Sequence, residues 1–259
     1  MQFFRDVANI AIKYYPDLLR GVGFTLLISL ISTVIGLIIG LLAGIIRTAP
    51  ESKNRFIKTL QRIINIIIAA YVEIFRGTPM MVQAMVIYWG YAFATDGVTL
   101  PLVPAGIFIV SINTGAYMAE IVRGGIISID KGQFEGAAAI GMTHWQTMFH
   151  VVIPQVLRNI LPSVSNEFVI NIKDTSVLNV IGVTELYYFA GIIKRQNFQT
   201  FQTYFVVCIL YFIMTYTITR LLRLFEKKLA GKDTYVIFGS QTAPEAEIHI
   251  DKGGAVPND

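Results

Sequence analysis

The sequence predicts an all-α integral membrane protein with about five transmembrane helices. The 259 residues are 54 % hydrophobic and only 15 % charged, whereas soluble domains carry roughly 25 % charged residues. Several charge-free stretches are long enough to cross a hydrocarbon core of about 30 Å, which takes roughly 20 helical residues. The formal charge is +4, and the basic residues flank the apolar stretches. That placement argues against nucleic acid as a partner and for a lipid bilayer.

Residues 1–20 predict an amphipathic helix that lies on the membrane surface. Apolar side chains recur at helical spacing from Phe3 to Leu18, and charged residues such as Arg5 and Lys13 occupy the other face. This pattern is typical of interfacial helices, although a packed helix of a soluble fold would show the same spacing. We expect no signal peptide, because no small-residue cleavage site follows a short apolar core.

The transmembrane domain is expected at residues 21–225. Four spans are predicted from charge-free stretches, at 21–46, 77–95, 97–119 and 196–219. A fifth span, at 156–183, is interrupted by Arg158, Glu167, Lys173 and Asp174. Residues 63–72 are also apolar, but about ten residues are too few to cross a bilayer. We therefore interpret them as an approach to the second span, with a bend at Pro79, which lacks a backbone N–H.

Basic residues predict the orientation of these spans. Five of them follow the first span between Arg47 and Arg62, and five more follow the last span between Arg220 and Lys232. Short loops rich in Lys and Arg face the cytoplasm. The N-terminus is therefore expected outside and the C-terminus inside, with a cytoplasmic loop at about 123–152. The polar tail at 231–259 is expected to be disordered.

The sequence lacks the usual signatures of an enzyme or a metal protein. It contains no G-x-x-x-x-G-K-[ST] loop for binding nucleotide phosphates. The single cysteine, Cys208, lies in an apolar run, and the three histidines show no ligand spacing with it. We expect no catalytic residue, no metal and no cofactor in this chain.

Residues 135–154, EGAAAIGMTHWQTMFHVVIP, predict a helix, a glycine turn and a second helix. Alanine favours the first helix, and Gly141 can adopt the left-handed conformation that ends it. Thr143 and Gln146 have the spacing of a capping box. A compact helical unit of this kind could fit a groove on a partner protein. An ordinary loop with a packing helix is equally consistent with the spacing.

Glycines and charged pairs predict contacts between helices. Gly36, Gly40 and Gly44 are four residues apart in the first span, and small residues at this spacing let two helices approach closely. Glu73 with Arg76, and Glu120 with Arg123, lie three residues apart, where opposite charges can pair on a helix.

Four separated segments resemble the membrane subunits of ABC importers, in the polar amino acid branch that includes histidine, glutamine and arginine permeases. The segments are YVEIFRGTPMMVQ, NTGAYMAEIVRGGI, KGQFEGAAAIGM and NEFVINIKDTSVLNVIGVTEL, within a resemblance that covers roughly residues 20–225. The importers carry an E-A-A motif, a glycine, and then I-x-L-P. Glu135, Gly141, Ile153 and Pro154 occupy matching positions, whereas Gly136 replaces the first alanine and the usual leucine before Pro154 is absent.

The resemblance implies a type I ABC importer fold in the bacterial plasma (inner) membrane. Two such permease subunits would pair as a homodimer or heterodimer above two ATPase subunits that bind ATP and Mg²⁺. An external solute-binding protein would deliver an amino acid. The loop from Glu135 to Pro154 would couple transport to ATP hydrolysis. The coupling residues implied are Glu135, Gly136, Ala137, Gly141, Met142, Thr143 and Trp145.

Polar groups inside the spans are the candidate substrate site. Charges at membrane depth are costly and usually face a cavity or a partner. Glu167, Asn171 and Asp174 share one helical stripe, and the carboxylates of Glu167 and Asp174 could bind the ammonium group or a cationic side chain of an amino acid. The predicted set is Asn113, Asn166, Glu167, Asn171, Asp174, Thr175 and Ser176. Structural pairing with a neighbouring Lys or Arg is the alternative.

Two rival functions use the same residues differently. An ion-coupled secondary amino acid transporter would use Glu167 and Asp174 as proton or sodium sites and would need no ATPase. An intramembrane enzyme would need a nucleophile paired with a base, and the sequence offers no such pair.

Overall fold

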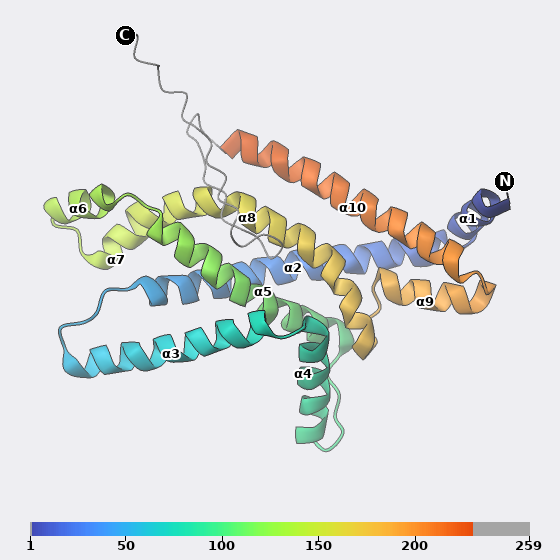
Figure 1. Ribbon diagram of the computed structural model, residues 1–259, viewed down its shortest axis with the longest axis horizontal. Helices are drawn as coiled ribbons and strands as arrows, with labels where there is room; N and C mark the ends of the chain where they lie inside the picture. The colour runs from blue at the N-terminus through green and yellow to red at the C-terminus, as the bar shows by residue number, and fades with distance from the viewer. Residues whose placement is uncertain (1, 230–259) are drawn as a thin grey trace, which may run out of the picture.

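The computed structural model describes residues 2–229, and within that range it is a bundle of helices without a strand (Figure 1). The α-helices are α1 (Gln2–Lys13), α2 (Tyr15–Thr48), α3 (Arg55–Gly77), α4 (Met80–Ala94), α5 (Leu102–Ile127), α6 (Lys131–Ala139), α7 (His144–Thr147), α8 (Ile153–Asp174), α9 (Leu186–Asn197) and α10 (Thr200–Leu229). A π-helical turn, η1 (Met148–Val152), joins α7 to α8, and a 3-10 helix, η2 (Thr175–Ile181), follows α8.

The predicted all-α fold with about five spans is confirmed. Helices α2, α5 and α10 are each long and apolar enough to cross a membrane, and two bent helix pairs bring the number of spans to as many as five. The pairs are α3 with α4, and the α7–η2 segment with α9. The direction of the termini across the membrane stays a prediction. The tail expected to be disordered, at 231–259, lies outside the described residues.

The N-terminal segment is divided into two helices. Helix α1 ends at Lys13, and α2 begins at Tyr15 with Pro16 in its first turn, a position where proline is well tolerated. The one helix expected over residues 1–20 is therefore broken. Helix α1 packs on α10, where the Phe3 ring lies 5.4 Å from Phe201 and 5.2 Å from Phe205.

Helices α2 and α5 are in very close contact along a line of glycines. A Cβ atom at Gly36 would lie 2.8 Å from Thr114 Cγ2, one at Gly40 would lie 2.6 Å from the carbonyl carbon of Met118, and one at Gly44 would lie 2.6 Å from Val122 Cγ1. The facing residues of α5 repeat every four positions, as the glycines do. The predicted small-residue contact is confirmed, and α5 is its partner.

The region of the second predicted span, at 77–95, is where the structure differs most from the sequence-based prediction. The apolar stretch at 63–72 belongs to α3, a 23-residue helix. Asn54 caps its start, and the Asn54 side chain accepts a hydrogen bond from Phe56 N at 2.9 Å. The segment that leads to the second span is therefore much longer than expected, and α3 and α4 together make one candidate bent span. The charged residues at 55–62 do not end the helix, because they lie on its polar face. The predicted bend at Pro79 is present, and α4 turns by 114° from α3 and points away from the bundle (Figure 1).

Two predicted spans, at 97–119 and 196–219, are shifted toward their C-terminal ends, whereas the span predicted at 156–183 begins earlier, at Ile153, and its α-helix ends at Asp174. Helix α5 begins after Pro101 and continues past Arg123 to Ile127, so the following connection begins at Ser128 and not at 123. Helix α10 begins at Thr200, not at 196, and continues to Leu229. Charged residues at a helix end do not terminate it, because long side chains can reach a polar interface.

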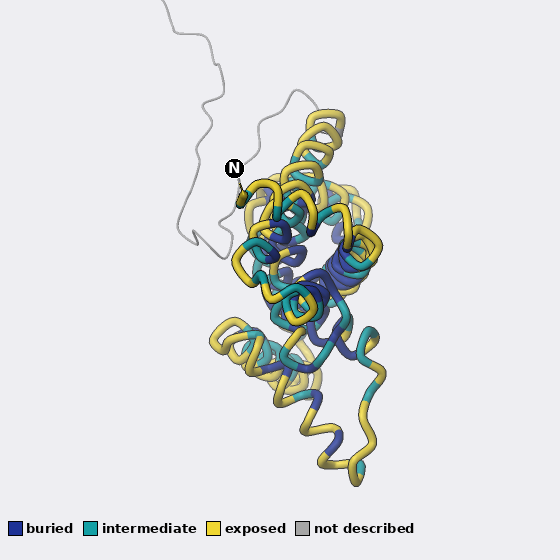
Figure 2. The backbone as a smooth tube through the Cα atoms, turned by 90° about the vertical axis from the view of Figure 1, so that its right-hand side faces the viewer, coloured by how far each residue is buried: buried dark blue, intermediate teal, exposed yellow. Residues whose placement is uncertain are grey.

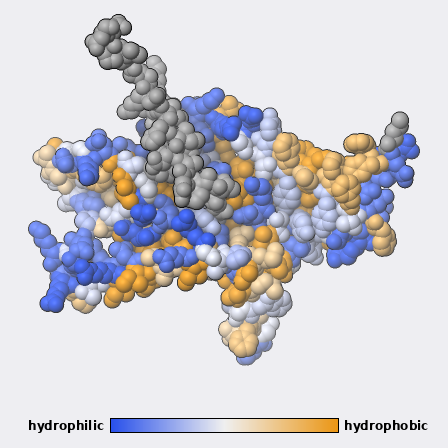
Figure 3. All heavy atoms as spheres, in the orientation of Figure 1, coloured by the Kyte–Doolittle hydropathy of each residue, from blue (hydrophilic) through white to orange (hydrophobic). Residues whose placement is uncertain are grey.

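The connections gather at two opposite ends of the bundle. The α2–α3 connection, α6 and α7 lie at one end, and α1, α9 and the start of α10 lie at the other (Figure 1). Hydrophilic surface surrounds the α2–α3 connection (Figure 3), where Glu51 pairs with Lys58 and Arg62. The hydrogen bond from Lys58 lowers the pKa of the Glu51 carboxyl. Buried residues concentrate inside the bundle (Figure 2).

Gly40→Ala is expected to lower the free energy of unfolding by about 1–3 kcal/mol, because the added methyl group must displace α5 backbone. Gly23→Ala is the matched control in the same helix, since a Cβ atom there meets nothing within 4 Å. The control should be neutral or stabilising by up to about 1 kcal/mol, because alanine favours helix over glycine. Thermal unfolding of both variants in detergent measures the difference, and equal midpoints would contradict the close contact.

Candidate functional site

A helix–turn–helix unit at residues 131–147 projects from one end of the bundle. Asp130 caps α6 by accepting a hydrogen bond from Gly132 N at 2.7 Å. After α6, Gly141 has a φ of +80°, the left-handed conformation that glycine adopts without strain. Thr143 and Gln146 then form a capping box at the start of α7, with Thr143 N donating to Gln146 Oε1 at 2.8 Å. The predicted helix, glycine turn and second helix are confirmed.

The outer surface of this unit is apolar and aromatic. Ile140 is 78 % exposed, and the exposed rings of Trp145 and Phe149 stack with centroids 6.1 Å apart. An open cavity of about 330 Å³ is lined by Ile140, Gly141 and His150 among others. Large exposed apolar groups on a compact unit are typical of a protein interaction site.

The structure brings the seven predicted coupling residues together on this unit. Ala137 is buried and Met142 is half-buried. The exposed members are Glu135, Gly136, Gly141, Thr143 and Trp145. On the inner side, Met148 and Val152 pack in one cluster with Ile121 and Ile126 of α5. The unit is therefore attached to the bundle by a packed core and continues through η1 into α8 without a loop.

An ion-pair network joins the ends of α2 and α5 just before this unit. Glu120 accepts hydrogen bonds from Arg123 Nε at 3.0 Å and Nη2 at 2.8 Å, and it also pairs with Arg47 of α2. The predicted pair of Glu120 and Arg123 is confirmed, whereas Arg47 was missed. Among the described residues, Glu73 and Arg76 form no ion pair, and Arg76 lies over the Tyr117 ring at 5.4 Å.

Asn171, from the predicted substrate set, links three helices. Its side chain is 3 % exposed, donates to Thr33 Oγ1 of α2 at 2.8 Å and accepts from Thr114 Oγ1 of α5 at 3.0 Å. Thr175 is also buried, and its hydroxyl donates to the Ile172 carbonyl at 3.0 Å. The Asn171 amide thus holds three helices together, whereas the Thr175 hydroxyl bonds within its own segment, at the end of α8.

Asn113 takes part in the bend between α3 and α4. Gln83 Nε2 donates to the carbonyls of Phe75 and Thr78, each at 2.9 Å, and Asn113 donates to Gln83 Oε1 at 2.9 Å. A broken helix leaves backbone carbonyls without partners, which is costly away from water. The sequence analysis did not identify Gln83. Its amide side chain, four residues after Pro79, is the feature of the sequence that could have indicated this role.

The charged members of the predicted set are two acids of α8. Glu167 is 1 % exposed, and Asp174 is half-buried. Arg76 of α3 lies over the ring of Tyr117 of α5, and the two acids share one stripe of α8. We refer to Arg76, Tyr117, Glu167 and Asp174, which come from three helices, as the polar cluster. Of the other two predicted residues, Ser176 is half-buried and Asn166 is exposed.

Glu185 is a buried acid that sequence reasoning also missed. It is fully buried, caps α9 by accepting hydrogen bonds from Tyr187 N at 2.9 Å and Tyr188 N at 2.8 Å, and accepts a third from the Tyr211 hydroxyl at 2.7 Å. The sequence could have indicated this role, because an acidic residue stands at the start of a helical stretch shortly after a glycine. That glycine, Gly182, has a φ of +87°.

Comparisons with known proteins agree on one family. Residues 36–231 match the family described as binding-protein-dependent transport system inner membrane component. The chain is 37 % identical over 167 residues to the glutamine transport system permease protein GlnP of Escherichia coli K12, covering 64 % of this chain and 76 % of that protein. It is 38 % identical over 171 residues to the L-cystine transport system permease protein TcyB of Bacillus subtilis, covering 66 % and 71 %.

A solved structure supports the same assignment. The chain resembles a crystal structure of an amino acid ABC transporter with histidines, with a TM-score of 0.71 and 36 % identity. The similarity covers 84 % of this chain and 96 % of that one. The fold expected from the sequence resemblance is confirmed.

Asn171→Ala is expected to reduce stability by about 1–2 kcal/mol, because interhelical hydrogen bonds in membranes contribute up to this amount and both threonines lose a partner. Asn166→Ala is the matched control on the same helix, since its side chain is exposed, and it should be close to neutral. Denaturant titration of the purified variants in mixed micelles checks this. Equal losses in the two variants would show that Asn171 does not link the helices.

Proposed function

The chain belongs to the family of binding-protein-dependent transport system inner membrane components, and we propose that it is the permease subunit of an amino acid importer driven by separate ATPase subunits. The family places it in the inner membrane as a multi-pass protein. The relatives named for glutamine and for L-cystine support an amino acid as the substrate. Two parts of the proposed mechanism belong to this chain, namely the docking of an ATPase subunit and the contact with the substrate.

The observation that carries the proposal is the exposed helix–turn–helix unit at residues 131–147. The aromatic surface formed by Trp145 of this unit and Phe149 of the adjoining η1 offers a docking site for an ATPase subunit on the cytoplasmic side. A docking element must move with the bundle if it is to transmit force. The packed core under Met148 and the Glu120 ion-pair network both support such rigid coupling. ATP and Mg²⁺ bind to the ATPase subunits, not to this chain.

The polar cluster of Arg76, Tyr117, Glu167 and Asp174 is the proposed contact site for the substrate. An amino acid carries an ammonium group that carboxylates can bind and a carboxylate that a guanidinium can bind. The cluster holds both kinds of group on different helices. Asn113 and Asn171 link helices of this region, and Asn166, Thr175 and Ser176 belong to the same stretch of α8 and η2 as the two acids. A second permease subunit would complete the path.

Transport then follows from two states of the paired permeases. ATP in the ATPase subunits and a loaded binding protein outside favour one state, and their release favours the other. The α6–α7 unit would carry the movement of the ATPase into α8 through η1. Because α8 holds Glu167 and Asp174, that movement would change access to the polar cluster.

A secondary transporter is the second candidate, because buried carboxylates such as Glu167 can bind protons or sodium ions. Uptake of labelled amino acids into proteoliposomes tests the two functions. The proposed importer requires its ATPase subunits, internal ATP and external binding protein, and an ion gradient alone should drive no uptake. Gradient-driven uptake by the permease alone would establish the second candidate.

Gly141→Val is expected to uncouple ATP hydrolysis from uptake. A Cβ atom at this position meets nothing within 4 Å, so the effect comes from the backbone, where a β-branched residue resists a φ of +80°. The strain of about 1–3 kcal/mol would reorient α7 relative to α6. Gly136→Ala is the control, because it restores the alanine of the E-A-A motif. The ratio of amino acids transported to ATP hydrolysed measures coupling, and an unchanged ratio in Gly141→Val would contradict the role of the turn.

Glu167→Gln is expected to slow amino acid uptake by roughly tenfold or more, because a charge-assisted hydrogen bond to the ammonium contributes about 1.5–3 kcal/mol. Copurification with the ATPase subunits should be retained. Glu73→Gln provides a comparison with an exposed acid of α3. Uptake by Glu167→Gln at the wild-type rate and half-saturating concentration would remove this residue from the substrate path.

A further inference from the structure

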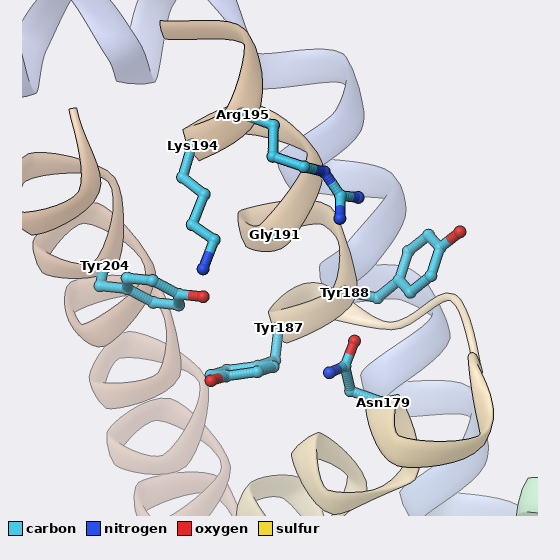
Figure 4. Close-up of a pocket in the computed structure, with 7 residues that line it drawn as sticks. All are labelled: Asn179, Tyr187, Tyr188, Gly191, Lys194, Arg195 and Tyr204. Atoms are coloured by element: carbon cyan, nitrogen blue, oxygen red, sulfur yellow. The ribbon is translucent and has the colours of Figure 1, made fainter. Parts of the chain in front are cut away.

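A second cavity, of about 370 Å³, lies at the end of the bundle opposite α6 and α7. It lies between α9, the start of α10 and η2 (Figure 4). Asn179 lines it from η2, Lys194 and Arg195 from α9, and Tyr204 from α10. If α6 and α7 face the ATPase, this cavity opens to the outside.

Two cations dominate the lining of the cavity. Lys194 Nζ lies 5.4 Å from the centre of the Tyr204 ring, and the Tyr187 ring lies 5.4 Å from that of Tyr204. In Figure 4 the ammonium of Lys194 points toward the two tyrosines, and the guanidinium of Arg195 lies on the side of Tyr188. Aromatic faces hold cations in place without neutralising their charge.

The described part of the chain forms no ion pair with these two cations. Within residues 2–229, no ion pair involves Lys194 or Arg195. The nearby acid Glu185 is fully buried and already accepts three hydrogen bonds. The cavity therefore combines positive charge with hydroxyl and amide donors, which is the chemistry that binds an anion.

Gly191 keeps the cavity open on the α9 side. It lies between the tyrosines and the cations of α9, and a Cβ atom there would meet nothing within 4 Å. A larger side chain at this position would extend into the cavity without displacing the surrounding helices.

We propose that this cavity receives a carboxylate side chain of the external binding protein when that protein docks, an inference that rests on the proposed function. Tyrosine and arginine are the residue types enriched at the centres of protein interfaces, and complementary charges orient a docking partner. A free amino acid fits less well, because its ammonium group would lie beside two cations with Glu185 already engaged.

The importer complex of this permease with its ATPase subunits, in phosphatidylcholine nanodiscs, tests the assignment. The probe is the amino acid-loaded binding protein of the same importer, and the measurement is the concentration that gives half-maximal stimulation of ATP hydrolysis. The double variant Lys194→Gln, Arg195→Gln is expected to raise this concentration roughly tenfold, the order expected for two partly exposed ion pairs. Gly191→Leu should raise it as well, by filling the cavity and leaving both cations in place.

Arg20→Gln is the matched control, because Arg20 lies in α2 near the same end of the bundle, is exposed and rests over the Phe24 ring at 6.0 Å outside the cavity. It should leave the half-stimulating concentration unchanged. High salt should raise the wild-type value toward that of the double variant, because salt screens exposed charges.

Three results would overturn the inference. An unchanged half-stimulating concentration in both the double variant and Gly191→Leu would exclude the cavity from docking. A defect that appears only when phosphatidylglycerol is added would assign the cavity to an anionic lipid. If free amino acid without binding protein stimulated the wild-type complex but not the variants, the cavity would be assigned to the substrate. A wild-type complex that no binding protein stimulates would refute the proposed function as well.

Discussion

The close contact of α2 with α5 is the constraint on which the rest of the structure depends. Side chains larger than glycine at positions 36, 40 and 44 would meet the backbone or side chains of α5. The short separation lets Thr33 and Thr114 reach the two ends of one amide, that of Asn171, and lets Arg47 reach Glu120. Packing, polar links and the ion-pair network thus all require the same interhelical distance.

Continuous helical structure connects the two distant ends of the chain. The helix–turn–helix unit is anchored on α5 through the cluster around Met148 and is continuous with α8. Helix α8 leads to the polar cluster and then, through η2, to α9 at the other end. Because no flexible loop interrupts the path from α7 to η2, a displacement of the unit would be transmitted to Glu167 and Asp174.

Polar residues within the apolar helices fall into two groups. Asn171, Asn113 and Gln83 use their hydrogen-bonding capacity on neighbouring helices or on the carbonyls of the α3–α4 bend. The polar cluster carries charges of both signs, with Arg76 over the Tyr117 ring and the acids Glu167 and Asp174 on α8. Hydrogen-bonded amides form lasting links between helices. Opposite charges on different helices fit the proposed zwitterionic substrate, which must bind and then leave.

The sequence by itself determined the features that depend on neighbouring residues. Long apolar stretches predicted the spans, and Gly141 with the Thr143 capping box predicted the helix–turn–helix unit, because hydropathy and capping act within a few positions. Only the tertiary structure decided which polar residues meet, since Asn171 bonds partners 138 and 57 positions away. It also decided the 114° turn of α4 and the full length of α3. Those features depend on which faces of distant helices pack together, and no local pattern encodes that choice.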